Sequence, residues 1–333
     1  MLLRLLCLLA CAAATTNFTA HVVVACDAHQ FQGLGAVLHS AAAAAGASAP
    51  RLAFTVVVPE ADAATAARLA ACAVGGSGAS ARVVAVERTG AARLQIPGYD
   101  DFAASGPEEA ARQAAKRAKY GRLGSRLNYA RFFLDELLPA DAATALYVDV
   151  DAVVHCDAVA LLRDALPRLE ASRPDRGGAV AAVDRGGTAA APRRRLFRRG
   201  PSSPSFNAGV FAADLGRWRA AGATARLVAA MAEAAASVRR NGTTFLSRPS
   251  SQAPMVRVFG ADFLPLDPRW NRVFHDHERD APPRDVAATL AGAAPPADCV
   301  WHFTGGRKPW DDDPATSWAR RAWAPHGVGR CLS

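Results

Sequence analysis

Short apolar runs that alternate with helix-like segments constrain the fold of this chain more than any other feature. The runs show no polar alternation, so each would be buried on both faces of a sheet. Strands are expected at 21–26, 51–58, 82–86, 143–149 and 177–184. Helices are expected at 33–45, 61–72, 125–138 and, after an ordered segment at 206–214, at 215–240. This order predicts an α/β fold with a Rossmann-like, mixed but mainly parallel sheet flanked by helices.

The length and composition are compatible with a single domain. The chain has 333 residues, of which 51% are hydrophobic and 21% charged, as is ordinary for a globular α/β protein. Such a chain can bury one large core or two smaller ones, but no repeat and no linker divides it. We therefore expect one domain over residues 20–325, preceded by a leader at 1–19 and followed by a C-terminal tail at 326–333.

The leader has the pattern of a secretory signal peptide. Residues 1–14 are apolar with one early arginine, and they end in small residues that form an Ala-x-Ala-type cleavage site. The stretch is shorter than the roughly 20 apolar residues that span a bilayer, and a short signal-anchor is the alternative. The triplets at 17–19 and 241–243 match the N-glycosylation pattern. We expect a glycoprotein of the secretory pathway, in the ER or Golgi lumen or secreted after cleavage.

The cysteines do not have the spacing of a structural zinc site. Two of the seven cysteines lie in the leader, and the others show no CxxC pair. Their number is odd, so at least one thiol is expected to be free even in an oxidising compartment. The sequence assigns no pairing among Cys26, Cys72, Cys156, Cys299 and Cys331.

The formal net charge of +9 is compatible with nucleic acid, anionic membranes or phosphorylated small molecules as partners. Much of the excess lies in one run, residues 193–199, which is flanked by proline and glycine. We interpret this run as a solvated surface loop, with a clamp over an anionic donor or acceptor as the functional alternative. No nucleic-acid-binding motif accompanies it, so no nucleic-acid partner is expected, and membrane contact is expected only through an N-terminal anchor.

Two carboxylates stand at the end of one expected strand. The apolar residues 146–148 run directly into Asp149, Val150 and Asp151. On an extended chain, residues i and i+2 point the same way, so both carboxylates can face one point beyond the strand, at the edge where open α/β sheets bind ligands. Carboxylates so close repel unless a cation lies between them, and oxygen ligands suit Mg²⁺ or Mn²⁺. The alternative is a polar strand end whose aspartate caps the next turn.

Two further clusters add to this candidate cation site. In the segment 300–310, His302 ends an expected strand and is followed by two glycines and Lys308. Glycines let backbone N–H groups approach a phosphate and the lysine supplies a charge for it, while an imidazole ligand favours Mn²⁺. A purely structural histidine is the alternative. In the other cluster, Asn207 precedes small residues that include Gly209, which suits hydrogen bonding to sugar hydroxyls or, alternatively, a turn.

Together these clusters resemble glycosyltransferase family 8. The matching pieces keep the family's order and approximate spacing, and they lie at 126–133, 146–151, 206–210 and 302–310. The segments 254–259 and 266–271 are most similar to the animal-type glycosyltransferase 8 domain-containing proteins. The resemblance covers nearly the whole chain after the leader. It implies a GT-A fold and transfer of a hexosyl or related sugar, with retention of anomeric configuration, from a UDP-sugar to a hydroxyl group of a glycan, protein or small molecule.

The resemblance also implies roles for individual residues. Asp149, Asp151 and His302 would hold Mn²⁺, with Mg²⁺ as the alternative ion. Gln252 and Asp184 are the catalytic candidates, and Asp184 would also contact the sugar with Asn207. The donor would be bound by Ala25, Cys26, Asp27, Arg131, Asp149, Val150, Asn207, Gly209, Gly305 and Lys308.

The chain departs from the family pattern at the reacting centre. Bacterial galactosyltransferase members have an Asp-Gln pair under the reacting face of the sugar, and the aligned residues here are Ser251 and Gln252. The first strand also continues as Asp-Ala-His-Gln at 27–30 instead of Asp-x-Asn-Tyr. With no carboxylate nucleophile in the matched motifs, we expect front-face substitution, with Gln252 stabilising an oxocarbenium-like centre. The alternative function is a non-catalytic relative that binds a UDP-sugar or glycan. A nucleotidyltransferase or phosphohydrolase is a third hypothesis, against which the segment 302–310 argues.

Overall fold

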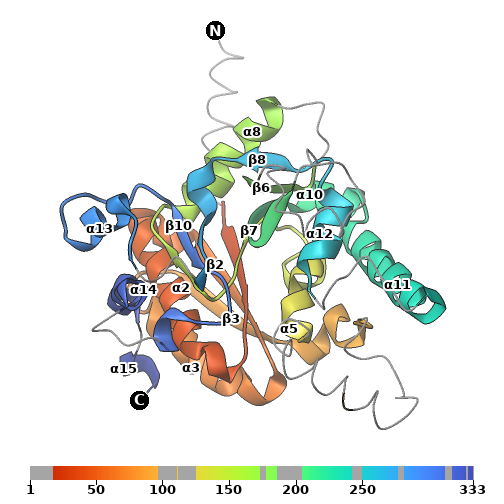
Figure 1. Cartoon of the computed structure of the whole chain (residues 1–333), viewed down its shortest axis with the longest axis horizontal. Coiled ribbons are helices and arrows are strands. Elements are labelled where there is room, and N and C mark those ends of the chain that lie inside the picture. Colours follow the sequence, from red (N-terminus) through yellow and green to blue (C-terminus); the bar gives the residue numbers. More distant parts are fainter. Residues whose placement is uncertain are drawn as a thin grey trace.

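The computed structural model describes residues 18–96, 111, 125–172, 178–185, 205–241, 250–276, 281–311, 317–327 and 329–332. The basic run 193–199 and residues 1–17 of the expected leader lie outside these residues. The described residues form an α/β structure in which a large sheet and a small sheet are covered by helices (Figure 1).

The large sheet has the strand order β3-β2-β1-β4-β7-β6-β8. Its strands are β1 (Ala20–Ala25), β2 (Leu52–Val58), β3 (Ser80–Ala85), β4 (Thr144–Val148), β6 (Val180–Asp184), β7 (Phe206–Asp214) and β8 (Leu264–Leu266). Four of its six strand pairings are parallel, and only β7 runs antiparallel to its neighbours β4 and β6. The prediction of a mixed but mainly parallel sheet is confirmed.

The small sheet joins segments that are far apart in the sequence. Its strands are β5 (Ala152–Val154), β9 (Arg272–Phe274) and β10 (Val300–Phe303). Strand β10 lies between the other two, antiparallel to β5 and parallel to β9. Because β4 of the large sheet leads into β5 through residues 149–151, the two aspartates lie at the junction of the two sheets.

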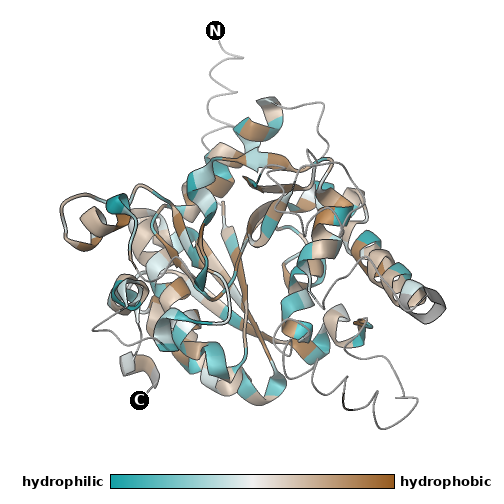
Figure 2. Cartoon of the chain, in the orientation of Figure 1, coloured by the Kyte–Doolittle hydropathy of each residue, from teal (hydrophilic) through white to brown (hydrophobic). Residues whose placement is uncertain are grey.

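The helices cover both faces of the large sheet. They are α2 (Phe31–Ala45), α3 (Ala63–Val74), α5 (Arg126–Tyr129), α6 (Leu134–Leu137), α7 (Ala158–Ala160), α8 (Leu166–Ser172), α10 (Leu215–Ala220), α11 (Ala223–Asn241), α12 (Gln252–Phe259), α13 (Arg284–Leu290), α14 (Trp318–Trp323) and α15 (Gly329–Leu332). Val22 and Val24 of β1 pack into one hydrophobic cluster and Val23 into the other. The central strands are accordingly hydrophobic along their length (Figure 2), as the apolar runs predict.

The prediction of a continuous helix is wrong for two segments. The segment 125–138 is divided into α5, a 3₁₀ turn η6 (Ala130–Phe132) and α6. The side chain of Arg131 bonds back to the carbonyl of Asn128 and inward to Asp149, so tertiary contacts override the local helix propensity. The segment 215–240 is divided into α10 and α11 at Gly222, whose φ of 57° lies in the left-handed region that ends helices.

Two disulfides join distant parts of the chain. Cys72 of α3 bonds Cys331 of α15, and Cys156 after β5 bonds Cys299 before β10. Cys26 is a buried free thiol, in agreement with the odd cysteine count. Half of the segment expected as a C-terminal tail is the short helix α15, which the first disulfide attaches to α3. In the described parts of the chain, no helix has the length and apolar character needed to cross a bilayer.

Candidate metal centre and active site

The two aspartates after β4 and the histidine of β10 meet at the junction of the sheets. Ligand atoms of Asp149, Asp151 and His302 all lie within 4.8 Å of one another. Nε2 of His302 is 3.3 Å from Oδ1 of Asp151 and 3.8 Å from Oδ2 of Asp149. The predicted convergence of these three side chains is confirmed.

Backbone pairing holds the three side chains in place. Residues 302 and 152 are partners across β10 and β5, and the N–H of Phe303 donates to the carbonyl of Asp151 at 2.8 Å. The N–H of Asp149 donates to the carbonyl of Gly209 at 2.7 Å, which continues the β4–β7 ladder. A Cβ atom at Gly209 would clash with His302 and would lie 2.5 Å from Oδ2 of Asp149. Glycine therefore lets β7 approach the site this closely.

Each aspartate has one oxygen paired with a cationic side chain. Nη2 of Arg131, a residue only 4% exposed, lies 2.7 Å from Oδ1 of Asp149. Its guanidinium also stacks 4.3 Å above the centre of the Tyr147 ring. The ammonium of Lys308 forms an ion pair with Oδ2 of Asp151. The remaining oxygens, Asp149 Oδ2 and Asp151 Oδ1, are the ones that face His302.

These neighbours keep the site charged although it is buried. Burial by itself raises the pKa of the Asp151 carboxyl, but the charges and hydrogen bonds of Lys308 and His302 hold it well below its usual range. Burial likewise disfavours the charged form of Arg131, yet Asp149 raises the pKa of the guanidinium above its usual value. Two carboxylates with an imidazole nitrogen are a donor set that fits a divalent cation such as Mn²⁺.

Ser251 and Gln252, the residues predicted at the reacting centre, form a second network. Gln252, the first residue of α12, accepts from the N–H of Ala208 at 2.7 Å and donates to the carbonyl of Phe206. It therefore holds the backbone on both sides of Asn207. The hydroxyl of Ser251, which is 2% exposed, donates to Oδ1 of Asn128 at 3.0 Å.

The Ser251 network reaches the metal centre. Oδ1 of Asn128 also accepts from Nη2 of Arg131 at 3.0 Å. Arg131 in turn contacts Asp149. Ser251 is therefore the outer member of a chain of hydrogen bonds that ends on a candidate metal ligand.

The residues predicted at the first strand lie at the same sheet edge. The parallel register pairs Val23 with Tyr147, so Ala25 is level with Asp149. Cys26 is fully buried, and its N–H donates to the carbonyl of Val57 at 3.0 Å. Asp27 caps the next turn, where Oδ1 accepts from the N–H of residue 29 at 3.0 Å.

The other predicted donor residues are spread around the centre. Val150 is buried between the two aspartates. Gly305 has a φ of 116°, which favours glycine, and the next N–H donates to Asp276 at 3.1 Å. Asp184 is the exposed last residue of β6 and is the partner of Phe206 in β7.

Sequence reasoning missed Asn271 and Asn128. Asn271 is buried at the end of the 3₁₀ turn η8 (Pro268–Asn271), and its Oδ1 lies 3.0 Å from Nδ1 of His302. Both asparagines lie in segments that resemble the family, at 266–271 and 126–133, and this resemblance was their only signal.

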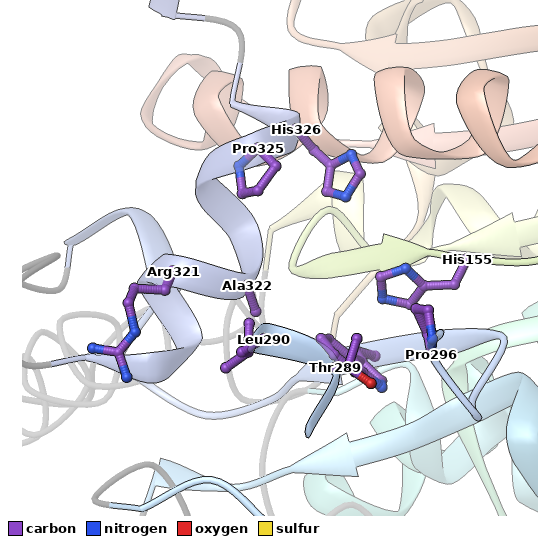
Figure 3. A pocket seen from close by; sticks show the side chains of 9 residues that line it. His155, Thr289, Leu290, Pro296, Arg321, Ala322, Pro325 and His326 are labelled. Atoms are coloured by element: carbon purple, nitrogen blue, oxygen red, sulfur yellow. The ribbon is translucent and has the colours of Figure 1, made fainter. Parts of the chain in front are cut away.

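A separate pocket of about 300 Å³ lies behind β10 (Figure 3). It is lined by Trp301, His155 and His326 among others. Because successive residues of a strand point to opposite faces, Trp301 faces this pocket while His302 faces the metal centre. Burial, followed by the charge of His326, lowers the pKa of His155 to about 4. Burial, followed by His39, lowers that of His326 to about 4.

Comparison with known proteins defines the class of the molecule. The model of the family described as "Glycosyl transferase family 8" matches residues 22–314. The chain therefore belongs to glycosyltransferase family 8. The matched region contains most of the first strand, both aspartates, Asn207, Gln252 and the whole His302 segment.

Two curated relatives are plant proteins from Arabidopsis thaliana. "Probable galacturonosyltransferase-like 3" is 29% identical over 191 residues, which are 56% of this chain and 51% of the relative. "Probable galacturonosyltransferase-like 6" is 29% identical over 185 residues, which are 55% of this chain and 50% of the relative. The chain thus spans about half the length of these relatives. The closer likeness to animal-type members stays a prediction.

Solved structures share the fold at low sequence identity. The galactosyltransferase LgtC, in complex with donor and acceptor sugar analogues, matches with a TM-score of 0.56 and 19% identity, over 92% of this chain and 96% of that one. Mouse xyloside xylosyltransferase 1 in its apo form matches with a TM-score of 0.52 and 14% identity, over 85% and 97%. The predicted GT-A fold is confirmed.

Proposed function

We propose that this protein is a metal-dependent glycosyltransferase that transfers a hexosyl or related sugar from a UDP-sugar to a hydroxyl acceptor, with retention of anomeric configuration. The observation that carries the proposal is the convergence of Asp149, Asp151 and His302 in a chain of glycosyltransferase family 8. We propose Mn²⁺ as the ion because an imidazole nitrogen joins the two carboxylates, with Mg²⁺ as the alternative.

The contacts of Asp149, Asp151 and His302 support a proposal for which of their atoms would bind the ion. Oδ2 of Asp149, Oδ1 of Asp151 and Nε2 of His302 would hold the ion, since the other carboxylate oxygens contact Arg131 and Lys308. A bound Mn²⁺ would neutralise charge on the departing diphosphate. Lys308 would add a second positive charge for the diphosphate, as the resemblance implies.

The start of β7 is proposed to bind the transferred sugar. Gln252 fixes the backbone on both sides of Asn207, so the Asn207 side chain is held where it can bond a sugar hydroxyl. Asp184 ends the neighbouring strand and is proposed as a second sugar contact. Because Ser251 replaces the family's carboxylate, we propose front-face substitution, in which a phosphate oxygen of the donor takes the proton of the acceptor hydroxyl.

The main alternative is a non-catalytic relative that binds a UDP-sugar or glycan. Ser251 is the observation that favours it. Against it, Ser251 remains connected to Asp149 through Asn128 and Arg131. A protein that only bound glycan would have no requirement for this complete set of buried charges, so catalysis is the better hypothesis.

We further propose that the protein acts in the secretory pathway. Its two disulfides support this location, because disulfides persist in oxidising compartments and are rare in the cytosol. The signal-peptide pattern of residues 1–14 supports it independently.

A donor panel tests the function. Release of UDP would be measured with UDP-galacturonate, UDP-galactose, UDP-xylose, UDP-glucose and UDP-glucuronate, with and without Mn²⁺, over varied hydroxyl acceptors. We expect Mn²⁺-dependent turnover of one donor, and NMR of the product should show the donor's anomeric configuration. Binding of donors without turnover of any of them would favour the non-catalytic alternative.

A further inference from the structure

We infer that Asn271 is a positioning residue that sets the tautomer of His302, through hydrogen bonds that begin at the backbone N–H of Gly209. The inference rests on the metal site of the proposed function. Asn271 is 3% exposed and lies at the end of η8, outside the motifs that carry the metal ligands. It is hydrogen-bonded to both His302 and Asn207.

The hydrogen bond from the N–H of Gly209 identifies the oxygen of the Asn207 side-chain amide. The N–H of Gly209 lies 2.9 Å from the side-chain atom of Asn207 assigned as Oδ1. A backbone N–H only donates, so the Asn207 atom that it contacts must be the carbonyl oxygen of the side-chain amide. The orientation of the Asn207 amide is therefore defined by the strand itself.

The second pair of bonds orients Asn271. One end of its amide lies 3.4 Å from Oδ1 of Asn207 and 3.5 Å from the backbone oxygen of Asn207. Both of these atoms are acceptors, so this end must be the NH₂ group. The carbonyl end of Asn271 consequently faces Nδ1 of His302 at 3.0 Å.

The last bond sets the proton on the imidazole. The amide oxygen of Asn271 can only accept, so Nδ1 of His302 must carry a hydrogen, which leaves Nε2 as the ring nitrogen that can offer a lone pair to a cation. Nε2 is the atom that faces Asp149 and Asp151. With the opposite tautomer, an N–H would point at Asp151 and occupy the oxygen proposed as a ligand. Asn271 thus presents a ligand atom to the cation.

The tautomer is measurable without metal or substrate. In ¹⁵N-labelled full chain free of divalent ions, two-bond ¹⁵N–¹H correlations should show a proton on Nδ1 of His302. The signals are assigned by their disappearance in His302→Gln. We expect Asn271→Leu, which removes the acceptor at similar volume, to lose this pattern. A wild-type His302 without a proton on Nδ1 would overturn the inference.

Metal affinity gives a second readout. Free Mn²⁺ would be followed by EPR during titration of the full chain. Removal of the partner of a ligating histidine costs about 10–100-fold in metal affinity, so Asn271→Leu should raise the Kd for Mn²⁺ by that factor. Asn271→Asp should lose less, because its carboxylate still accepts from Nδ1–H. Wild-type affinity in Asn271→Leu would overturn the inference.

A matched core variant separates positioning from general destabilisation. Leu227 is fully buried in α11 and packs into a hydrophobic cluster that contains none of the three proposed ligands. Leu227→Ala should lower the thermal midpoint and leave the Kd for Mn²⁺ unchanged. A loss of Mn²⁺ affinity in Leu227→Ala as large as in Asn271→Leu would show that lost stability alone explains the effect, and would overturn the inference.

Failure of this inference and failure of the proposed function are distinguishable. Mn²⁺ binding with the predicted tautomer, but no turnover of any UDP-sugar, would remove the proposed function and leave the role of Asn271 intact. Normal sugar transfer by the wild type, together with unchanged Mn²⁺ affinity in Asn271→Leu, would support the proposed function and remove the role of Asn271.

Discussion

Histidines that lie on the two sides of strand β10 have opposite environments. On the front face, His302 lies between two carboxylates and is hydrogen-bonded to Asn271. On the back face, Nε2 of His155 and Nδ1 of His326 are buried without a hydrogen-bond partner among the described residues. The same kind of side chain is held by charged groups on one face of the strand and by packing on the other.

The difference shows that burial does not by itself identify a functional histidine. A buried imidazole beside anions can accept a cation or a proton, because its surroundings compensate the charge. A buried imidazole without such partners is restricted to its neutral form, which is why the pKa values of His155 and His326 are lowered to about 4. The front face is thus suited to chemistry, and the back face contributes to stability only while it stays neutral.

The largest effect is expected from Asp151→Asn on the front face. The substitution removes one ligand charge and leaves Lys308 beside a neutral amide. Since a catalytic metal supplies several kcal/mol of charge stabilisation and each 1.36 kcal/mol is a factor of ten, transfer should fall by about 10³-fold or more. UDP release and Mn²⁺ binding by EPR would measure the loss.

Asp298→Asn is the matched control for that prediction. Asp298 is also a largely buried aspartate paired with a cation, Arg272, but it accepts from the indole of Trp301 on the other side of β10. The Asp298→Asn variant should lose some stability and retain its affinity for Mn²⁺. Equal loss of Mn²⁺ binding in both variants would contradict the assignment of the front face.

The next effect is expected from Lys308→Met. Methionine keeps an apolar stem of similar length but removes the ammonium that would contact the diphosphate. A hydrogen bond to a charged group contributes about 1.5–3 kcal/mol, so affinity for UDP in the presence of Mn²⁺ should fall by about 10–100-fold. Calorimetric titration with UDP would measure it. Unchanged affinity for UDP would show that Lys308 only neutralises Asp151.

Low pH should destabilise the protein by protonating His155 and His326 on the back face of β10. An unfolded histidine has a pKa near 6.5, whereas those of His155 and His326 are lowered to about 4 in the folded protein. The unfolded state therefore binds more protons between these values, so the free energy of unfolding falls as the pH decreases from 6.5 towards 4. Both side chains are partly exposed, so we expect a loss of about 2–3 kcal/mol.

Urea denaturation with the disulfides intact would measure this pH dependence. His155→Phe should reduce it, because the variant has no imidazole to protonate at that position. His29, which is exposed beside Asp27, provides the control: His29→Gln should leave the dependence unchanged. An identical pH profile in wild type and His155→Phe would show that other groups cause the acid sensitivity.

The parallel half of the fold was predictable because each strand is an uninterrupted apolar run. Strands β1, β2 and β3 lie within about two residues of their expected ranges. The helix expected at 125–138 was wrong because its interruption comes from a long-range contact, the pairing of Arg131 with Asp149. Propensity within the segment carries no information about a carboxylate on β4.

The site shows the same limit. Asp149 and Asp151 were predictable from their spacing at a strand end, and His302 from its glycine-lysine context. Asn271 was not, since its role depends on the ring orientation of a histidine 31 residues away. Amide orientation and tautomer are properties of a closed hydrogen-bond network, and no local pattern encodes them.

The smallest effect is expected from Trp301→Phe, one residue from a metal ligand but on the opposite face. Phenylalanine fills much of the buried site and loses the indole hydrogen bond to Asp298 of 3.1 Å. Asp298 keeps its ion pair with Arg272 at 2.7 Å. The free energy of unfolding should therefore fall by only about 1–2 kcal/mol, while the Kd for Mn²⁺ stays unchanged. A weakened metal site in Trp301→Phe would show that the two faces are coupled through the strand, because only a shift of the β10 backbone could carry the change from Trp301 to His302.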